Sequence, residues 1–259
     1  MTERIIARKE GAVGWLIFNN PERRNAVSVD MWEAIPSVLS QFESDGEIRV
    51  VVLAGAGDKA FVSGADISQF EKQRSTAETV AHYDEVGEKA QTRLKTFEKP
   101  VIAMIRGYCI GGGLNIANLC DLRIAADDSR FGIPAAKMGL GYRASSTKNL
   151  VDIVGKAAAL EIMITARQFN ADDALRMGLV HKVVPVPELE KATREYCEMI
   201  TANAPLTMRS AKRIIREVVA NDYDAAACSA WVKECFDSED YREGRRAFME
   251  KRKPVFRGR

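Results

Sequence analysis

The first half of the chain alternates short apolar runs with longer segments of helical periodicity. Runs rich in valine, isoleucine and leucine predict buried β-strands, at residues 13–19, 49–55, 99–107 and 121–126. Apolar side chains spaced as on one face of a helix predict amphipathic helices, at residues 28–44 and 79–97. Apolar strands joined by helices indicate a sheet that is covered on both faces. The predicted fold class is therefore α/β.

The second half of the chain is mostly helical. Two consecutive helices are predicted at residues 145–155 and 156–165, and a further helix starts at the capping residue Asn170 and ends at Gly178. One short strand over residues 178–185 precedes three or four more helices. The change at Pro185–Pro187 predicts a core of residues 1–185 and a C-terminal helical subdomain of residues 186–259.

Composition and charge narrow the class of protein. The 259 residues carry a formal net charge of +2, so no global positive field attracts nucleic acid. No apolar run is long enough to span a bilayer, and the N-terminus lacks the apolar core of a signal peptide. The five cysteines form no CxxC pair, which is typical of reduced thiols in a cytoplasmic protein. We therefore predict a cytoplasmic protein that binds neither membrane nor nucleic acid.

The glycine motif GAGDKA at residues 55–60 fits the dinucleotide-binding pattern GxGxxA directly after a predicted strand. In that pattern the glycines open a helix that packs against the strand. Here the motif is followed by FVSGADI, which is typical of a loop. A nicotinamide-binding function is therefore disfavoured.

Two other glycine-containing loops follow predicted strands and suggest a different chemistry. Residues 63–67 have the sequence SGADI, and residues 107–113 have the sequence GYCIGGG. Each glycine at a helix start costs about 1 kcal/mol relative to alanine. A glycine triplet there indicates close packing or backbone N–H groups that face an anion. If each loop offers one N–H to the same oxygen atom, the two form an oxyanion hole.

Five longer motifs extend over nearly the whole chain, in this order: NNPERRNAVS, VVLAGAGDKAFVSGADI, KPVIAMIRGYCIGGGLNIANLCDLRIAADDSRFGIP, DDALRMGLVHKVVP and EDYREGRRAFMEKRKPVF. In these motifs the chain resembles the enoyl-CoA hydratase/isomerase, or crotonase, superfamily. The resemblance implies a spiral of strand–strand–helix turns with a C-terminal helical region used for trimerisation. It implies an acyl-CoA substrate and a homotrimer, with a dimer of trimers as a further possibility. Coenzyme A is then part of the substrate, and neither a separate cofactor nor a metal is expected.

The resemblance also implies roles for individual positions. The donors of the oxyanion hole are Ala65 and Gly112, whose N–H groups stabilise an enolate-like form of the thioester. The positions implied for contact with coenzyme A are Arg24, Ala26, Ala60, Ile67, Phe248 and Lys251, of which the last two reach the nucleotide.

The acidic positions of the family are not acidic in this chain. Family hydratases carry one Glu two residues after the glycine triplet and another after the FGxP stretch, where this chain has Asn115 and Ala135. Some isomerases and a dehalogenase carry an Asp eight residues further on, where this chain has Arg143. Neither an amide nor a methyl group accepts a proton at neutral pH, so hydration by two glutamates is disfavoured. The histidines His82 and His181 are expected to be structural.

An enolate also forms without a base when a malonyl-type thioester loses CO2. From the sequence we therefore favour a base-free reaction of this kind, in which Tyr142 or Arg143 orients the departing carboxylate and Asn115 donates a hydrogen bond to it. The C-terminal half is most similar to methylmalonyl-CoA decarboxylases and naphthoate synthases. The decarboxylases share Tyr142 but have His in place of Ala65 and Thr in place of Pro134. Two alternatives stay open, namely hydration or isomerisation by non-standard groups, and binding of acyl-CoA without catalysis.

Overall fold

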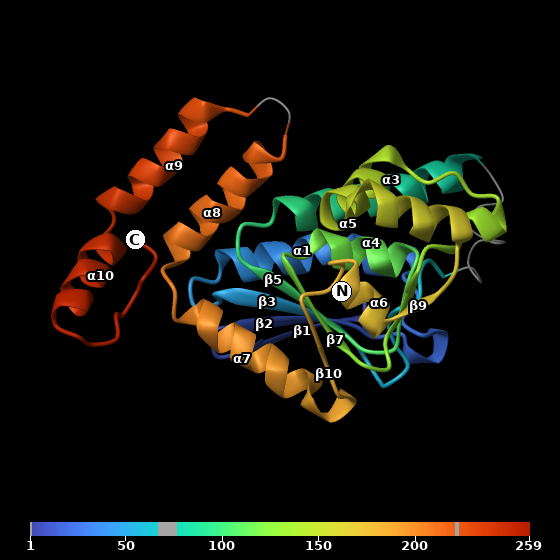
Figure 1. Cartoon of the computed structure of the whole chain (residues 1–259), viewed down its shortest axis with the longest axis horizontal. Helices are drawn as coiled ribbons and strands as arrows, with labels where there is room; N and C mark the ends of the chain where they lie inside the picture. Colours follow the sequence, from blue (N-terminus) through green and yellow to red (C-terminus); the bar gives the residue numbers. More distant parts are fainter. Residues whose placement is uncertain (1, 67–76, 221–222) are drawn as a thin grey trace.

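The computed structural model describes residues 2–66, 77–220 and 223–259, and Figure 1 shows their arrangement. A six-stranded sheet with the strand order β1-β2-β3-β5-β7-β10 forms the centre of the molecule. The pair β1–β2 is antiparallel, and the other pairs are parallel. The strands are β1 (Ile5–Glu10), β2 (Val13–Phe18), β3 (Val50–Gly55), β5 (Val101–Ile105), β7 (Leu122–Ala126) and β10 (Lys182–Val184).

A smaller sheet contains β4 (Ala60–Val62), β6 (Tyr108–Ile110), β8 (Arg130–Gly132) and β9 (Phe169–Asn170), in that order. Along the chain, β3, β5 and β7 are each followed by a strand of this smaller sheet and then by a helix. The repeated unit is strand–strand–helix, which confirms the predicted α/β spiral. Because β4 and not a helix follows the GAGDKA motif, that motif does not form a dinucleotide-binding turn.

Helices cover both faces of the larger sheet, as predicted (Figure 1). On one face, α7 (Leu189–Thr201) packs Leu189, Ala192 and Cys197 against apolar side chains of the strands. The opposite face is covered by α1 (Val29–Ser44), α3 (Ala77–Thr96), α4 (Gly112–Leu119) and α5 (Ala144–Thr165). The main apolar core lies between these four helices and the sheets.

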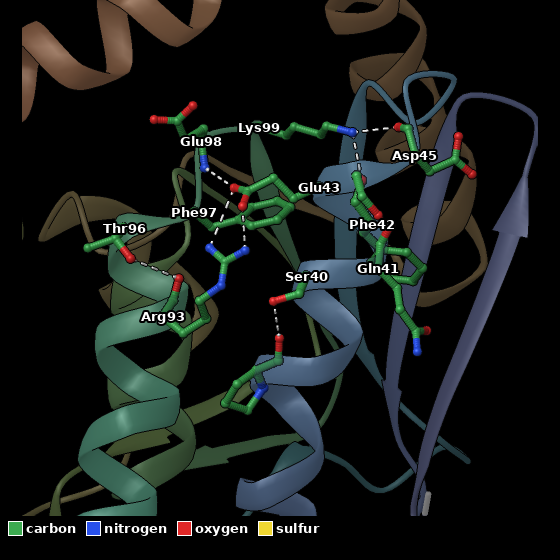
Figure 2. A network of polar contacts seen from close by, with 12 residues as sticks. Ser40, Gln41, Phe42, Glu43, Asp45, Arg93, Thr96, Phe97, Glu98 and Lys99 are labelled. Atoms are coloured by element: carbon green, nitrogen blue, oxygen red, sulfur yellow. Dashed lines mark hydrogen bonds and ion pairs between the residues drawn. The ribbon is translucent and has the colours of Figure 1, made fainter.

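A polar network joins the C-terminal ends of α1 and α3 (Figure 2). The Glu43 carboxylate accepts hydrogen bonds from the Arg93 guanidinium at 2.6 Å and from the Glu98 N–H at 3.3 Å. The Lys99 ammonium donates to the backbone carbonyls of Phe42 at 2.6 Å and Asp45 at 2.7 Å. These bonds hold α3 against α1 just before the chain enters β5, and so they help to set which face of α3 meets its neighbours.

Local sequence signals account for several helix boundaries. The two helices predicted over residues 145–155 and 156–165 are confirmed within α5, where they meet at a kink at Gly155, whose φ of +73° is not helical. The Asn170 side chain accepts a hydrogen bond from the Asp173 N–H at 2.8 Å and caps α6 (Ala171–Arg176) as predicted. Gly178, with φ of +72°, ends that segment. Within α1, the helix continues through Pro36. Short 3-10 helices occupy η1 (Pro21–Arg23), η3 (Pro134–Met138) and η4 (Val186–Glu188).

Three further helices extend away from the spiral (Figure 1): α8 (Pro205–Val218), α9 (Ala225–Asp237) and α10 (Glu239–Met249). An ion pair of 2.6 Å between Lys212 and Asp121 attaches α8 to the core. Together with α7, these helices confirm the prediction of three or four helices after the last strand. Large apolar side chains are exposed on them, including Ile215, Val218, Phe236, Phe248 and Met249. No helix in the described ranges has the length and apolar character needed to cross a membrane.

Candidate active site

Two backbone N–H groups, those of Ala65 and Gly112, lie close together in the loops that follow β4 and β6. Ala65 forms a parallel bridge with Val27, in which Val27 N–H donates to Gly64 O at 2.9 Å and Asp66 N–H donates to Val27 O at 3.1 Å. The bridge therefore uses the carbonyl of Gly64 and the N–H of Asp66. The N–H of Ala65, which lies between them, points away from Val27. Gly112 is the first residue of α4, where N–H groups have no acceptor within the helix.

The two N–H groups are close together. A Cβ atom built on Gly112 would lie 3.9 Å from the nitrogen of Ala65, and one built on Gly64 would lie 4.0 Å from the nitrogen of Gly112. Gly64 has φ of +112°, a backbone conformation that favours glycine. No hydrogen bond between described residues uses the N–H of Ala65 or Gly112. The two N–H groups therefore lie close together with no acceptor among the described residues.

The glycine triplet, Gly111 to Gly113, also allows α4 to pack closely against the smaller sheet. A Cβ atom on Gly113 would lie 2.0 Å from the carbonyl oxygen of Val62 in β4. Gly111, with φ of +55°, donates its N–H to Gly132 O in β8 at 2.8 Å. Close approach of α4 to the smaller sheet therefore requires glycine at these positions, and that approach holds Gly112 beside Ala65.

The two N–H groups open into a cavity of about 360 Å³. It brings together every predicted catalytic position, since Ala65, Gly112, Asn115, Tyr142 and Arg143 all line it. Ala135, which replaces the second family Glu, lies in η3 and also lines the cavity. The apolar part of the wall consists of Trp32, Ile110, Ile133, Met138 and Leu140.

Asn115 lies in the first turns of α4 and is only 4% exposed. Its side-chain Nδ2 donates to Oε1 of Gln91 on α3 at 2.7 Å. Its Oδ1 is buried and has no hydrogen-bond partner among the described residues. A buried acceptor without a partner costs about 1–3 kcal/mol of stability.

Tyr142 and Arg143 come from the segment between η3 and α5. Burial, with a smaller contribution from Cys109, raises the pKa of Tyr142 to about 12, so its hydroxyl stays protonated at neutral pH. Arg143 precedes the first turn of α5, and its guanidinium forms an ion pair of 2.7 Å with Asp84 and a longer one of 4.0 Å with Glu88. Both acidic partners are on α3.

Sequence reasoning did not identify which residues of α3 line the cavity. Tyr83, Asp84 and Gln91 of this helix all line it. Asp84 and Gln91 are seven residues apart, a spacing that puts two side chains on the same helix face. The spacing is visible in the sequence, but which face of the helix meets α4 depends on how α3 docks against α1.

The described positions that were predicted to contact coenzyme A do not all line the same cavity. Arg24 and Ala60 line a second cavity of about 470 Å³, and the Arg24 guanidinium lies 5.0 Å from the centre of the Tyr108 ring. The two cavities are adjacent, because Ser63 of the first donates its N–H to Arg24 O at 3.1 Å. Ala26 is 7% exposed and lines neither cavity. Ile67 lies outside the described residues.

The two predicted C-terminal contacts, Phe248 and Lys251, lie at the end of α10 and line neither of these cavities. Phe248 is 83% exposed. The histidines also lie outside both cavities: His82 is 3.5 Å from Glu33, and His181 accepts a hydrogen bond from the Arg123 N–H at 3.2 Å. Within the described ranges, no group of acidic, histidine or cysteine side chains is arranged to hold a metal ion.

Comparisons with known proteins agree with this geometry. The sequence model of the enoyl-CoA hydratase/isomerase family matches residues 8–259. The short-chain-enoyl-CoA hydratase of Clostridium acetobutylicum is 39% identical, with 96% of this chain and 95% of that protein aligned. The (E)-benzylidenesuccinyl-CoA hydratase of Thauera aromatica is 33% identical over 95% of this chain and 96% of its own length.

Solved structures show the same relationship. The crystal structure of an enoyl-CoA hydratase/carnithine racemase from Magnetospirillum magneticum superimposes with a TM-score of 0.96 at 36% identity, covering 100% of this chain and 97% of the other. The family match extends over nearly all of the chain, and the identity to several relatives exceeds 30%. The chain therefore belongs to the enoyl-CoA hydratase/isomerase family.

Proposed function

We propose that the protein is a hydratase or isomerase of acyl-CoA thioesters that works without the two glutamates of its family. The observation that carries the proposal is the pair of convergent N–H groups of Ala65 and Gly112 in the wall of the 360 Å³ cavity. A thioester oxygen placed between them gains negative charge when its α-carbon becomes enolate-like. Each preorganised donor of this kind is worth about 3 kcal/mol in the transition state.

The remaining walls suit the other parts of such a substrate. The apolar side chains of Trp32, Ile133 and Met138 offer a surface for an acyl chain. The adjacent cavity, lined by Arg24 and Ala60, offers space for the arm of coenzyme A. Coenzyme A is in this proposal part of the substrate, and the chemistry needs no further cofactor.

Two observations favour hydration or isomerisation over the base-free decarboxylation expected from the sequence. The relatives described above are named as hydratases. The guanidinium of Arg143, which that hypothesis assigned to the departing carboxylate, is paired with Asp84 and Glu88 of the chain itself. Loss of CO2 from a malonyl-type thioester is the second candidate, because Asn115 and Ala135 supply no acid or base.

The test is to incubate the purified protein separately with crotonyl-CoA, 3-butenoyl-CoA, malonyl-CoA and methylmalonyl-CoA and to follow the products by chromatography coupled to mass spectrometry. The chromatographic step is needed because 3-butenoyl-CoA and crotonyl-CoA have the same mass. We expect crotonyl-CoA to gain the mass of one water, or 3-butenoyl-CoA to convert to crotonyl-CoA. Loss of CO2 from either malonyl-type thioester would instead support decarboxylation. Binding of coenzyme A in calorimetry without turnover of any substrate would refute the proposal and indicate a binding protein.

Three properties inferred from the sequence stay predictions: a homotrimer or dimer of trimers, a cytoplasmic location, and the division into parts at residue 185. The exposed apolar side chains of α8 to α10 are consistent with a surface that is covered in an oligomer. Light scattering on the purified protein measures the oligomeric state directly.

A further inference from the structure

The cavity of about 360 Å³ described above is lined by a carboxylate of α3. Asp84 is the only Asp or Glu among the described residues that line this cavity. It is on the same helix face as Gln91, about 10 Å nearer the start of α3, since seven residues rise about 1.5 Å each. Gln91 in turn bonds Asn115 of α4 at 2.7 Å. This face of α3 is therefore held against the helix that carries the oxyanion N–H of Gly112.

An arginine from a third element fixes the orientation of this carboxylate. The Arg143 guanidinium, at the start of α5, lies 2.7 Å from Asp84 Oδ1. The pair therefore links α3 and α5 across the wall of the cavity. A carboxylate has two oxygens with about four acceptor positions, so pairing with one arginine leaves it capacity to accept a proton from water.

We propose that Asp84 is the proton-transfer residue of this site and that it takes over the work of the missing glutamates. The inference rests on the function proposed above, a hydratase or isomerase of acyl-CoA thioesters. Asp84 reaches the cavity from a different element than either missing family acid, whose positions are occupied by Asn115 and Ala135 in α4 and η3.

The hydration step balances with a single carboxylate. Asp84 takes one proton from a water molecule as the water oxygen bonds to the β-carbon of the enoyl thioester. The π electrons move toward the thioester, whose oxygen becomes negative between the N–H groups of Ala65 and Gly112. The protonated Asp84 then gives its proton to the α-carbon, the C=O bond re-forms, and the carboxylate is restored. The product is the 3-hydroxyacyl thioester.

Asn115 cannot replace this carboxylate. Its Oδ1 is an acceptor that cannot remove a proton, and it is buried from water. In isomerisation the same carboxylate suffices, because it removes a proton from the α-carbon of a 3-enoyl thioester and returns it to the γ-carbon as the double bond moves.

The other polar groups of the cavity are poorer proton carriers. With its pKa raised to about 12, Tyr142 is a hydrogen-bond donor and not a base near pH 7. Arg143 is permanently charged. Ser146, at the start of α5, is 7% exposed and has an uncharged hydroxyl. Asp84 is thus the group of this wall whose chemistry fits the proton transfer.

The test compares Asp84→Asn with the matched control Glu88→Gln in the full-length protein. Glu88 is on the same helix and contacts the same arginine, but its side chain is 74% exposed and it does not line the cavity. We expect Asp84→Asn to lower kcat for hydration or isomerisation about 10²- to 10⁴-fold with KM changed less than threefold. Glu88→Gln should keep kcat within threefold of the wild type, and Asp84→Glu should recover part of the lost rate.

The split between kcat and KM, together with recovery by Asp84→Glu, separates a catalytic role from a structural one. An Asp84→Asn variant that folds and keeps more than a third of the wild-type kcat would overturn the inference while leaving the proposed function intact. Equal losses in Asp84→Asn and Glu88→Gln would also overturn it, because they would point to the placement of Arg143. Failure of the wild-type protein on both enoyl substrates would instead refute the proposed function.

Discussion

The candidate active site has two halves that are built in different ways. The half that we propose to hold the thioester oxygen consists of backbone N–H groups, which loops between the two sheets place at Ala65 and Gly112. The half that faces the reacting carbons consists of side chains from α3, α4, η3 and α5. The first half depends on close backbone packing, such as that of Gly113 on Val62, and so it is preserved wherever the fold is preserved. The second half can change by single substitutions that leave the fold intact.

This difference explains why the family and the reaction are not equally visible in the sequence. The family model matches residues 8–259, so the family is visible over nearly the whole chain. Asn115 and Ala135, at positions where the family resemblance implies acids, lie in α4 and η3 and carry no acid. The proton carrier therefore has to be found from the cavity itself.

The largest expected effect comes from a methyl group in the backbone half. In Gly113→Ala the new Cβ would lie 2.0 Å from Val62 O and 2.8 Å from Val62 C, so α4 or β4 must move. We expect this variant to lose at least about 3 kcal/mol of unfolding free energy. Urea denaturation followed by circular dichroism measures the change.

The neighbouring Gly112→Ala is the matched control. Its Cβ would meet Gly64 Cα at 3.8 Å and Ala65 N at 3.9 Å, which is ordinary van der Waals contact. We expect a change in unfolding free energy of less than about 1 kcal/mol. Turnover should nevertheless fall about 10²-fold, because the methyl group takes up space next to the oxyanion N–H groups. Similar stability in the two variants would contradict the packing argument.

A smaller effect is expected from Asn115→Ala in the side-chain half. The substitution removes the bond of 2.7 Å to Gln91 and also removes the buried Oδ1 that has no partner. Loss of the hydrogen bond lowers the unfolding free energy, whereas loss of the unpartnered oxygen raises it. The unfolding free energy should therefore change by no more than about 1 kcal/mol. Turnover should fall about tenfold because the bond to Gln91 no longer holds the cavity-lining face of α3 against α4. A thermal melt and a kcat measurement on the same preparation check both, and a fully active variant would remove Asn115 from the mechanism.

The sequence predicts the fold well because its signals are local. Apolar runs joined by helical segments predict an α/β fold with a covered sheet, and Asn170 and Gly178 predict the ends of α6. The spiral itself is implied by the family resemblance. Two strands are clearly shorter than predicted, since residues 99–107 contain β5 (Val101–Ile105) and residues 178–185 contain β10 (Lys182–Val184).

The carboxylate of the site could not be predicted in this way. On an amphipathic helix, Asp84 looks like any solvent-facing residue. It reaches the cavity because the network of Glu43 and Arg93 docks α3 against α1, with the Gln91 face toward α4. Residues that are distant in sequence make these contacts, and no local pattern contains them. The same holds for the pairing of Asp84 with Arg143.

The smallest effect on activity is expected from Tyr142→Phe. Burial raises the pKa of Tyr142 to about 12, so the hydroxyl is protonated throughout the range from pH 6 to 9. The variant should keep kcat within about threefold of the wild type, with the same profile over that range. A change of profile there would show that Tyr142 takes part in proton transfer and would weaken the role of Asp84.

Stability at alkaline pH gives a second measurement on the same residue. Because the pKa of Tyr142 is higher in the folded state than its ordinary value near 10, the unfolded chain loses this proton first as the pH rises. The stabilising contribution is complete below about pH 10 and is lost between about pH 10 and pH 12. Wild type and Tyr142→Phe should therefore show the same difference in unfolding free energy at pH 7 and pH 9, and at pH 11 the wild type should lose more. If the unfolding free energies of the two proteins differ by the same amount up to pH 11, the Tyr142 hydroxyl is solvated. The side-chain half of the site would then be more exposed to water than the structure indicates.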